Sequence, residues 1–163
     1  MTKTATTTTT EGRDLIVTRV IDTTPEKVFR AWTEPELLRQ WFAPKPWTTP
    51  HVETDVRAGG STLVVMRGPD GTDFPNRGVY LEVVKNERLV FTDAFISAWE
   101  PSPKPFMTVI LTFENLGALC RCQVRHGSSR SLSARSAVSV WSAAASNRST
   151  AANATVYTSS GSP

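Results

Sequence analysis

The residues of this chain that could take part in chemistry are few and widely spaced. Its two histidines, His51 and His126, are 75 positions apart, and His126 has no acidic residue close to it in sequence. The sequence contains no glycine-rich phosphate loop, no G-x-S-x-G nucleophile motif and no Cys/His cluster with metal-ligand spacing. We therefore predict no metal and no cofactor, interpret both histidines as surface or strand-end residues, and favour a binding role over an enzyme.

The two cysteines, Cys120 and Cys122, are two positions apart. On a strand they would point to the same face, and neighbouring cysteines of one strand seldom reach disulfide geometry. A soft metal would need further ligands that the sequence does not place near them. We interpret them as reduced thiols, which favours a cytoplasmic location.

Two charged residues stand out because strand alternation groups them with apolar side chains. Asp93 would share a face with Phe91, and Arg77 would share a face with Val79 and Leu81. A charge on a buried face must be paired or lie in a wet cavity. Two interpretations remain open. The pair could orient a ligand in an apolar pocket, or both residues could lie near strand ends and reach solvent.

The other candidates are apolar residues, many of them aromatic, that could form a core or line a ligand cavity. The two roles do not exclude each other if the cavity is an incompletely filled core. The candidate cavity residues are Trp32, Trp41, Phe42, Met66, Arg77, Val79, Leu81, Phe91, Asp93, Phe95, Val109 and Leu111.

The elements that would position these residues begin with two short helices in residues 24–42. Pro25 suits a first helical position, and Thr33 and Glu36 have capping-box spacing for a second helix. Their apolar residues recur at helical spacing, but helices this short need a large apolar surface to cover. We expect that surface to be a sheet.

Strand-like segments lie on both sides of the helices. They are residues 14–21, 51–56, 61–67, 77–84, 88–96, 106–114 and 120–125. In the segment 106–114, apolar residues alternate with polar ones, which predicts one buried and one solvated face. The order of one strand, two helices and a run of antiparallel strands indicates an α+β fold.

Four segments carry a family resemblance. In chain order they are TPEKVFRAWTEPELLRQWFAP, GGSTL, RGVYLEVVKNERLVFT and TVILTFENLG, and together they resemble the activator of Hsp90 ATPase homologue (AHSA1-type) branch of the START-like (SRPBCC, Bet v 1-like) superfamily. The resemblance covers residues 14–117. It implies a helix-grip fold, in which a curved antiparallel sheet grips a long C-terminal helix around an apolar cavity.

The resemblance also implies a function. A small apolar or amphipathic ligand would bind between the sheet and the C-terminal segment. One alternative is a polyketide cyclase- or hydrolase-like enzyme using the same cavity, for which Asp93 is the candidate acid or base. The other is a cofactor of an Hsp90-type chaperone or an interaction module.

Residues 127–163 depart from the family pattern. They contain twelve Ser, eight Ala, no acidic residue and no Lys, where a long amphipathic helix is expected. A divergent natural segment and an out-of-frame segment both remain open, and reading the coding DNA in the other frames would decide between them. A sheet face left uncovered would favour a homodimer. We divide the chain into a disordered Thr-rich leader (1–12), a START-like domain (13–126) and this segment.

The charge distribution argues against nucleic acid as a partner. The net charge is +3, but residues 1–114 carry thirteen basic and fifteen acidic side chains, and the five remaining arginines are sparse in the last 49 residues. A nucleic-acid site needs a basic face on a folded module. No apolar run approaches the roughly 18 residues of a membrane span, and the N-terminal sequence lacks a signal-peptide pattern.

Overall fold

The computed structural model describes residues 6–98, 100–105 and 107–128. Two helices, α1 (Pro25–Thr33) and α2 (Pro35–Trp41), follow the second strand. The strands are β1 (Thr6–Glu11), β2 (Asp14–Ile21), β3 (Thr48–Thr54), β4 (Ser61–Arg67), β5 (Asp73–Val84), β6 (Arg88–Thr92), β7 (Phe95–Ser97), β8 (Glu100–Pro101), β9 (Met107–Asn115) and β10 (Cys120–Ser128).

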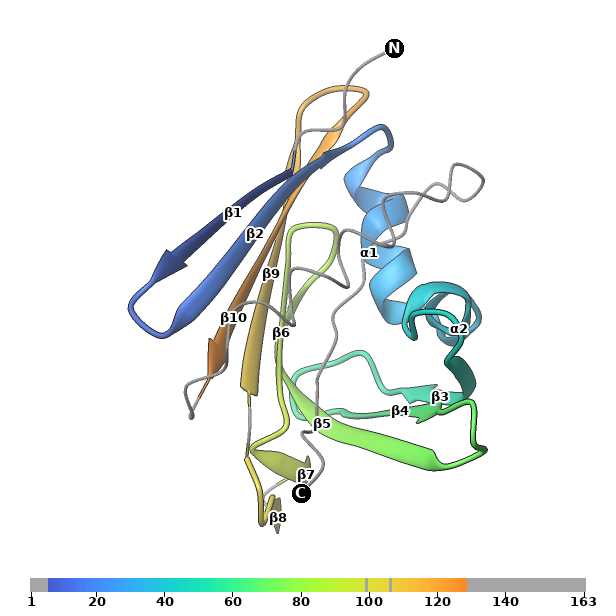
Figure 1. Cartoon of the computed structure of the whole chain (residues 1–163). Coiled ribbons are helices and arrows are strands. Elements are labelled where there is room, and N and C mark those ends of the chain that lie inside the picture. Colours follow the sequence, from blue (N-terminus) through green and yellow to red (C-terminus); the bar gives the residue numbers. More distant parts are fainter. Residues whose placement is uncertain (1–5, 99, 106, 129–163) are drawn as a thin grey trace.

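Eight strands form one curved antiparallel sheet in the order β1-β2-β10-β9-β6-β5-β4-β3, and β7 and β8 form a separate ribbon. Both helices lie on one side of the large sheet (Figure 1). We call this side the inner face and the opposite side the outer face. The expected α+β architecture, with a curved sheet and two short helices after a strand, is confirmed. The segment expected to be gripped by the sheet lies outside the described residues.

The core lies between the inner face and the two helices. One row of inner-face side chains is almost fully buried across four neighbouring strands, each residue at most 3% exposed: Val17, Val124, Leu111 and Leu89. From α1, Phe29 packs edge-on against Phe113 with ring centroids 5.8 Å apart. Each such side chain stabilises the fold by about 1.5–3 kcal/mol. The predicted alternation in β9 is confirmed, because Val109, Leu111 and Phe113 are all buried in this core.

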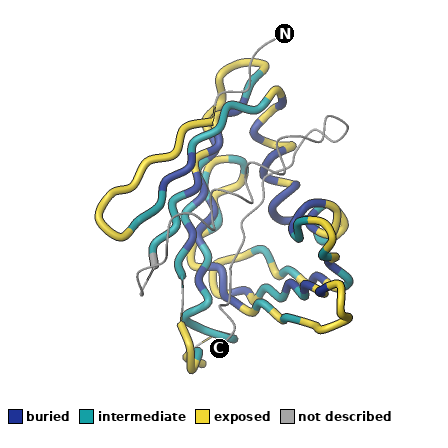
Figure 2. Tube along the Cα trace, in the orientation of Figure 1, coloured by how far each residue is buried: buried dark blue, intermediate teal, exposed yellow. Residues whose placement is uncertain are grey.

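The strand β1 departs from the expected disordered leader. Residues 6–11 pair with β2 from Thr6 opposite Arg19 to Glu11 opposite Asp14. A two-residue loop closes this hairpin, and its Gly12 has a φ of 60°, which glycine adopts readily. Threonine is β-branched and favours extended backbone once a neighbouring strand supplies hydrogen bonds. The prediction of disorder is therefore wrong for residues 6–11, which form an exposed edge strand (Figure 2). Residues 1–5 lie outside the described residues.

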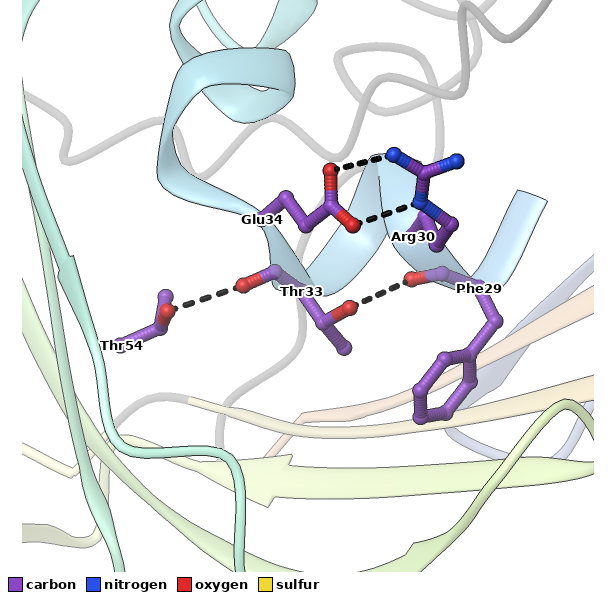
Figure 3. A network of polar contacts seen from close by, with 5 residues as sticks. All are labelled: Phe29, Arg30, Thr33, Glu34 and Thr54. Carbon is purple, nitrogen blue, oxygen red and sulfur yellow. Dashed lines mark hydrogen bonds and ion pairs between the residues drawn. The ribbon is translucent and has the colours of Figure 1, made fainter. Parts of the chain in front are cut away.

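The second helix begins differently from the predicted capping box. Glu34, not Thr33, occupies the N-cap position of α2, and Pro35 is its first residue. The hydroxyl of Thr33 donates a hydrogen bond to the carbonyl oxygen of Phe29, 2.9 Å away within α1 (Figure 3). Because Thr33 still belongs to α1, its pairing with Glu36 does not form.

The end of α1 is tied to its neighbours through its last carbonyl groups. The indole nitrogen of Trp41 donates to the carbonyl oxygen of Ala31 at 3.0 Å. The hydroxyl of Thr54 on β3 donates to the carbonyl oxygen of Thr33 at 2.9 Å. The end carbonyls of a helix lack partners within the helix. Side chains of α2 and β3 therefore fix where α1 stops and how it lies on the sheet.

Candidate functional site on the inner face of the sheet

A bulge in β5 changes which of its side chains face the core. Tyr80 pairs with Phe91 and Glu82 pairs with Val90, so Leu81 is an extra residue on β5. Successive strand residues point to opposite faces, and an extra residue reverses the alternation. Tyr80 is accordingly 2% exposed in the core, whereas Leu81 is 47% exposed.

This bulge places three of the predicted site residues away from the inner face. Val79 is buried, but it precedes the inward-facing Tyr80 and therefore points outward. Arg77 has the same parity as Val79 and is exposed, as is Leu81. The expectation that these three share the inner face is wrong, because it assumed regular alternation through the bulge. Val83, which follows the bulge, does pack against the core.

Most of the other predicted site residues do lie in the core. At most 8% of each is exposed: Trp32, Trp41, Phe42, Met66, Val109 and Leu111. Phe91 is half-buried at the edge of this cluster. Phe95 lies on β7 in the separate ribbon, outside the core cluster of the described residues, because the chain bends after Thr92. A contact between the core residues and a ligand remains a prediction.

The inner face is less completely covered in the row next to the fully buried one. This row crosses from β2 to β5 and consists of Leu15, His126, Val109, Phe91 and Tyr80. Within it, Leu15, His126 and Phe91 are half-buried. We call it the open row. It gives the described part of the domain a partly exposed strip of mixed apolar, aromatic and polar side chains.

His126 lies in a polar cluster at this strip. Its Nε2 atom is 3.1 Å from the sulfur of Met107, and the backbone N–H of Met107 donates to Oδ1 of Asp93 at 2.8 Å. Burial lowers the pKa of His126, while the charge of Asp93 acts in the opposite direction. Neutral imidazole is therefore favoured at pH 7, and it can donate or accept a hydrogen bond.

Of the predicted polar candidates, Asp93 lies near the open row, and the structure places a second polar residue, His126, in that row. Asp93 follows the end of β6 and lies beside the strip as a half-buried residue, on the side that alternation in the predicted strand 88–96 suggested. Sequence reasoning missed His126 because its neighbours belong to β2 and β9, and that register cannot be read locally. A usable signal was its parity with Cys122 and Val124, which are both buried on the inner face.

Four aromatic rings connect the helices to the open row. Ring centroids are 4.7 Å apart between Trp41 and Trp32, 6.5 Å between Trp32 and Phe91, and 6.2 Å between Phe91 and Tyr80. We call these four residues the aromatic series. Burial raises the pKa of Tyr80 to about 12, although its side-chain hydrogen bond with Thr62 acts the other way. The phenol is therefore neutral and held in place.

The indole nitrogen of Trp32 differs from these satisfied groups. It is buried, and within the described part of the chain it has no hydrogen-bond partner. Native proteins leave few buried N–H groups in this state, and each costs about 1–3 kcal/mol.

The two cysteines are free and fully buried on the inner face. Burial raises the pKa of Cys120 to about 11, and burial also raises the pKa of Cys122. A protonated, buried thiol is a poor nucleophile. Over residues 6–98, 100–105 and 107–128, no group of three or more His, Cys, Asp or Glu side chains could hold a metal ion. The described helices include none that is long and apolar enough to cross a membrane.

Comparisons with solved structures support this fold. A crystal structure of a protein from Nitrosomonas europaea is 34% identical and superposes with a TM-score of 0.68, covering 71% of this chain and 75% of that one. A protein from Chromobacterium violaceum is 22% identical at a TM-score of 0.68, covering 80% of this chain and 91% of that one. An AHSA1-like protein from Aeromonas hydrophila is 20% identical at a TM-score of 0.63, covering 78% and 85%. The last two show the fold alone.

Proteins with curated functions give no significant match. A family model described as activator of Hsp90 ATPase homolog 1-like protein matches residues 22–151. The match extends beyond residue 117, where the resemblance seen in the sequence stopped, into the Ser- and Ala-rich segment. It spans most of the chain and agrees with the helix pair and curved sheet. The chain therefore belongs to the family of activator of Hsp90 ATPase homolog 1-like proteins.

Proposed function

We propose that this protein binds a small apolar or amphipathic molecule on the inner face, along the open row. One observation carries the proposal. Three of the five side chains of the open row are half-buried, although the neighbouring row is almost fully buried. Ligand sites typically combine apolar walls with a few polar groups that fix orientation. The open row has this composition.

The parts of the strip would have different tasks. Leu15, Phe91 and Met107 offer apolar surface, and burying it under a ligand is favourable by about 25 cal/mol per Å². His126 and Asp93 supply polarity at one end of that surface. An amphipathic ligand would therefore place its apolar body over Phe91 and a polar group near His126.

Native mass spectrometry of the purified full chain tests the proposal. We expect a retained small molecule that is lost when Leu15→Gln makes the open row polar. Leu116→Gln makes the same chemical change at a 37% exposed residue in the turn between β9 and β10, and it should retain the molecule. Equal retention by both variants would show that the molecule binds elsewhere. The proposal would be refuted if the wild-type chain carries no bound mass and also fails to bind naphthalene ketones.

A second candidate function is catalysis on the bound molecule, as in cyclases or hydrolases. It is favoured by one observation, that Asp93 and His126 both flank Met107. A carboxylate near a neutral imidazole can support general acid–base catalysis. With p-nitrophenyl butyrate as the probe ester, Asp93→Asn should abolish turnover while sparing binding. Turnover unchanged by this substitution would remove Asp93 from the mechanism.

A third candidate rests on the description of the matched family, which names activation of an Hsp90 ATPase. The test is co-purification with an Hsp90-type chaperone, together with measurement of its ATPase rate. Stimulation that persists in Leu15→Gln would assign that activity to a surface other than the open row.

A further inference from the structure

We propose that the indole N–H of Trp32 is the donor that orients the bound molecule, and that this molecule carries a neutral acceptor oxygen on a flat, aromatic-like body. The inference rests on the proposed function and adds to it a recognition group and a ligand class. It follows from the hydrogen bonding of Trp32, from the aromatic series around it and from its connection to the open row.

The hydrogen bonding of Trp32 contrasts with that of its neighbour. Trp32 is 3% exposed, and its Nε1 atom is buried without a partner among the described residues. The Nε1 atom of Trp41 donates to the carbonyl oxygen of Ala31 at 3.0 Å. A buried donor is normally paired with protein or with bound water. An acceptor brought by a ligand would complete the hydrogen bonding of Trp32.

Two other polar side chains near the aromatic series, those of Tyr80 and Asn76, already have partners. The hydroxyl of Tyr80 interacts with the side chain of Thr62, and it is not one of the buried polar atoms that lack a partner. The side-chain amide of Asn76 donates to the carbonyl oxygens of Val64 and Phe74, at 3.1 and 3.2 Å. Within the part of the chain that the structure describes, Trp32 is therefore the residue of the aromatic series whose buried donor lacks a partner.

The rings around Trp32 indicate what kind of molecule would fit. Trp41 meets it edge-on, and Phe91 lies tilted beside it. Aromatic rings favour edge and offset contacts with other flat π-systems. Phe91 is also half-buried in the open row, so it connects Trp32 to the partly exposed strip. A flat ligand lying over Phe91 would therefore lie beside the ring of Trp32.

The acceptor should be neutral. The aromatic series contains no cation, and a buried carboxylate without a cation is strongly disfavoured. A ketone, aldehyde or ester oxygen satisfies the N–H without bringing a charge. The geometry thus points to a flat carbonyl compound and distinguishes it from a fatty acid or another anion.

Two probes of nearly equal shape test the inference. 2-Acetylnaphthalene carries a carbonyl oxygen where 2-isopropenylnaphthalene carries a methylene group. We expect the wild-type chain to bind the ketone about tenfold more tightly, which corresponds to about 1.4 kcal/mol. Trp32→Phe should bind the two probes equally, and Trp47→Phe, a ring packed against Phe74 outside the aromatic series, should keep the tenfold preference. A preference that survives in Trp32→Phe would overturn the inference.

A measurement on the wild-type chain decides the matter even if Trp32→Phe does not fold. The five tryptophans give five indole signals in a ¹⁵N–¹H spectrum, which substitutions at the other four assign by elimination. The Trp32 signal should move downfield with the ketone and not with the olefin. If the wild-type chain binds both probes equally and the Trp32 signal responds in the same way to both, the role of the Trp32 N–H is refuted, while binding on the inner face stands. If neither probe binds, this inference falls, and the proposed function falls with it when native mass spectrometry also finds no retained molecule.

Discussion

Trp32 and Trp41 form a T-shaped pair with ring centroids 4.7 Å apart, but only the indole N–H of Trp41 has a partner within the described structure. That partner is the carbonyl oxygen of Ala31. In a continuous helix this carbonyl would accept a bond from residue 35, but Pro35 has no N–H to offer. The indole N–H of Trp41 thus satisfies a carbonyl group near the end of α1, whereas the indole N–H of Trp32 has no partner among the described residues. The first residue has a structural role, and we assign the second to the ligand.

Removing the Trp41 indole should destabilise the domain. Trp41→Phe leaves the Ala31 carbonyl without its donor and leaves space in the core, so we expect a loss of about 2–4 kcal/mol in the free energy of unfolding. Urea denaturation monitored by circular dichroism measures it. Trp47→Phe, a partly buried residue, serves as the comparison. A loss below about 0.5 kcal/mol for Trp41→Phe would contradict the proposed repair of the helix end.

The hydrogen bond from Thr54 to the end of α1 should contribute less to the free energy of unfolding than the Trp41 indole does. Thr54→Val keeps the shape of the side chain but leaves the carbonyl oxygen of Thr33 without this donor, so we expect a loss of about 0.5–1.5 kcal/mol. Thr8→Val, on the exposed edge strand, should change stability by less than about 0.5 kcal/mol. If the two variants unfold at the same urea concentration, Thr54 does not help to fix α1.

The bulge in β5 predicts opposite outcomes for two leucines. Leu81→Ala should change the free energy of unfolding by less than about 0.5 kcal/mol, since its side chain is 47% exposed. Leu89→Ala should cost about 2–5 kcal/mol, since Leu89 is fully buried. Equal losses would indicate that β5 alternates regularly and that Leu81 faces the core. Thermal and urea denaturation of both variants would decide.

The burial of His126 predicts a pH dependence on the acid side. Because burial lowers its pKa in the folded state, the unfolded chain binds this proton more tightly. The folding stability that depends on neutral His126 is fully present above the ordinary histidine pKa of about 6.5, and it is lost as the pH falls through the folded-state pKa. His126→Gln should flatten the stability profile in that window. An imidazole NMR titration of the wild type giving a value above 6.5 would contradict this account.

The two thiols predict a loss of stability on the alkaline side. The pKa of Cys120 is raised by burial to about 11, so the folded state holds its proton more tightly than the unfolded state does. Stability should be intact below pH 9 and should fall as the pH rises toward 11. Cys120→Ala should reduce that loss. Both thiols should also resist Ellman's reagent at pH 8 until urea unfolds the chain, and rapid native labelling would contradict their burial.

Local patterns in the sequence identify some elements and miss others for physical reasons. The alternation in β9 and the apolar spacing of the helix pair are local properties, so Val109 and Trp32 could be placed correctly. The bulge at Leu81 depends on how β5 pairs with β6, and the environment of His126 depends on two partner strands. Which of the two neighbouring indoles has a hydrogen-bond partner among the described residues is likewise set by tertiary contacts. The Thr-rich composition of residues 6–11 wrongly predicted disorder, because these threonines form a strand once β2 lies beside them.

Methyl NMR on the full chain tests the central claim most directly, namely that ligands bind along the inner face. In a ¹³C-methyl-labelled sample titrated with 2-acetylnaphthalene, the signals of Leu15 and Val109 on the open row should shift in proportion to occupancy. Those of Ile16 and Val90, buried residues of the outer face, should stay in place. Shifts confined to Ile16 and Val90, or no shift at any of these methyl groups, would contradict the proposed binding surface.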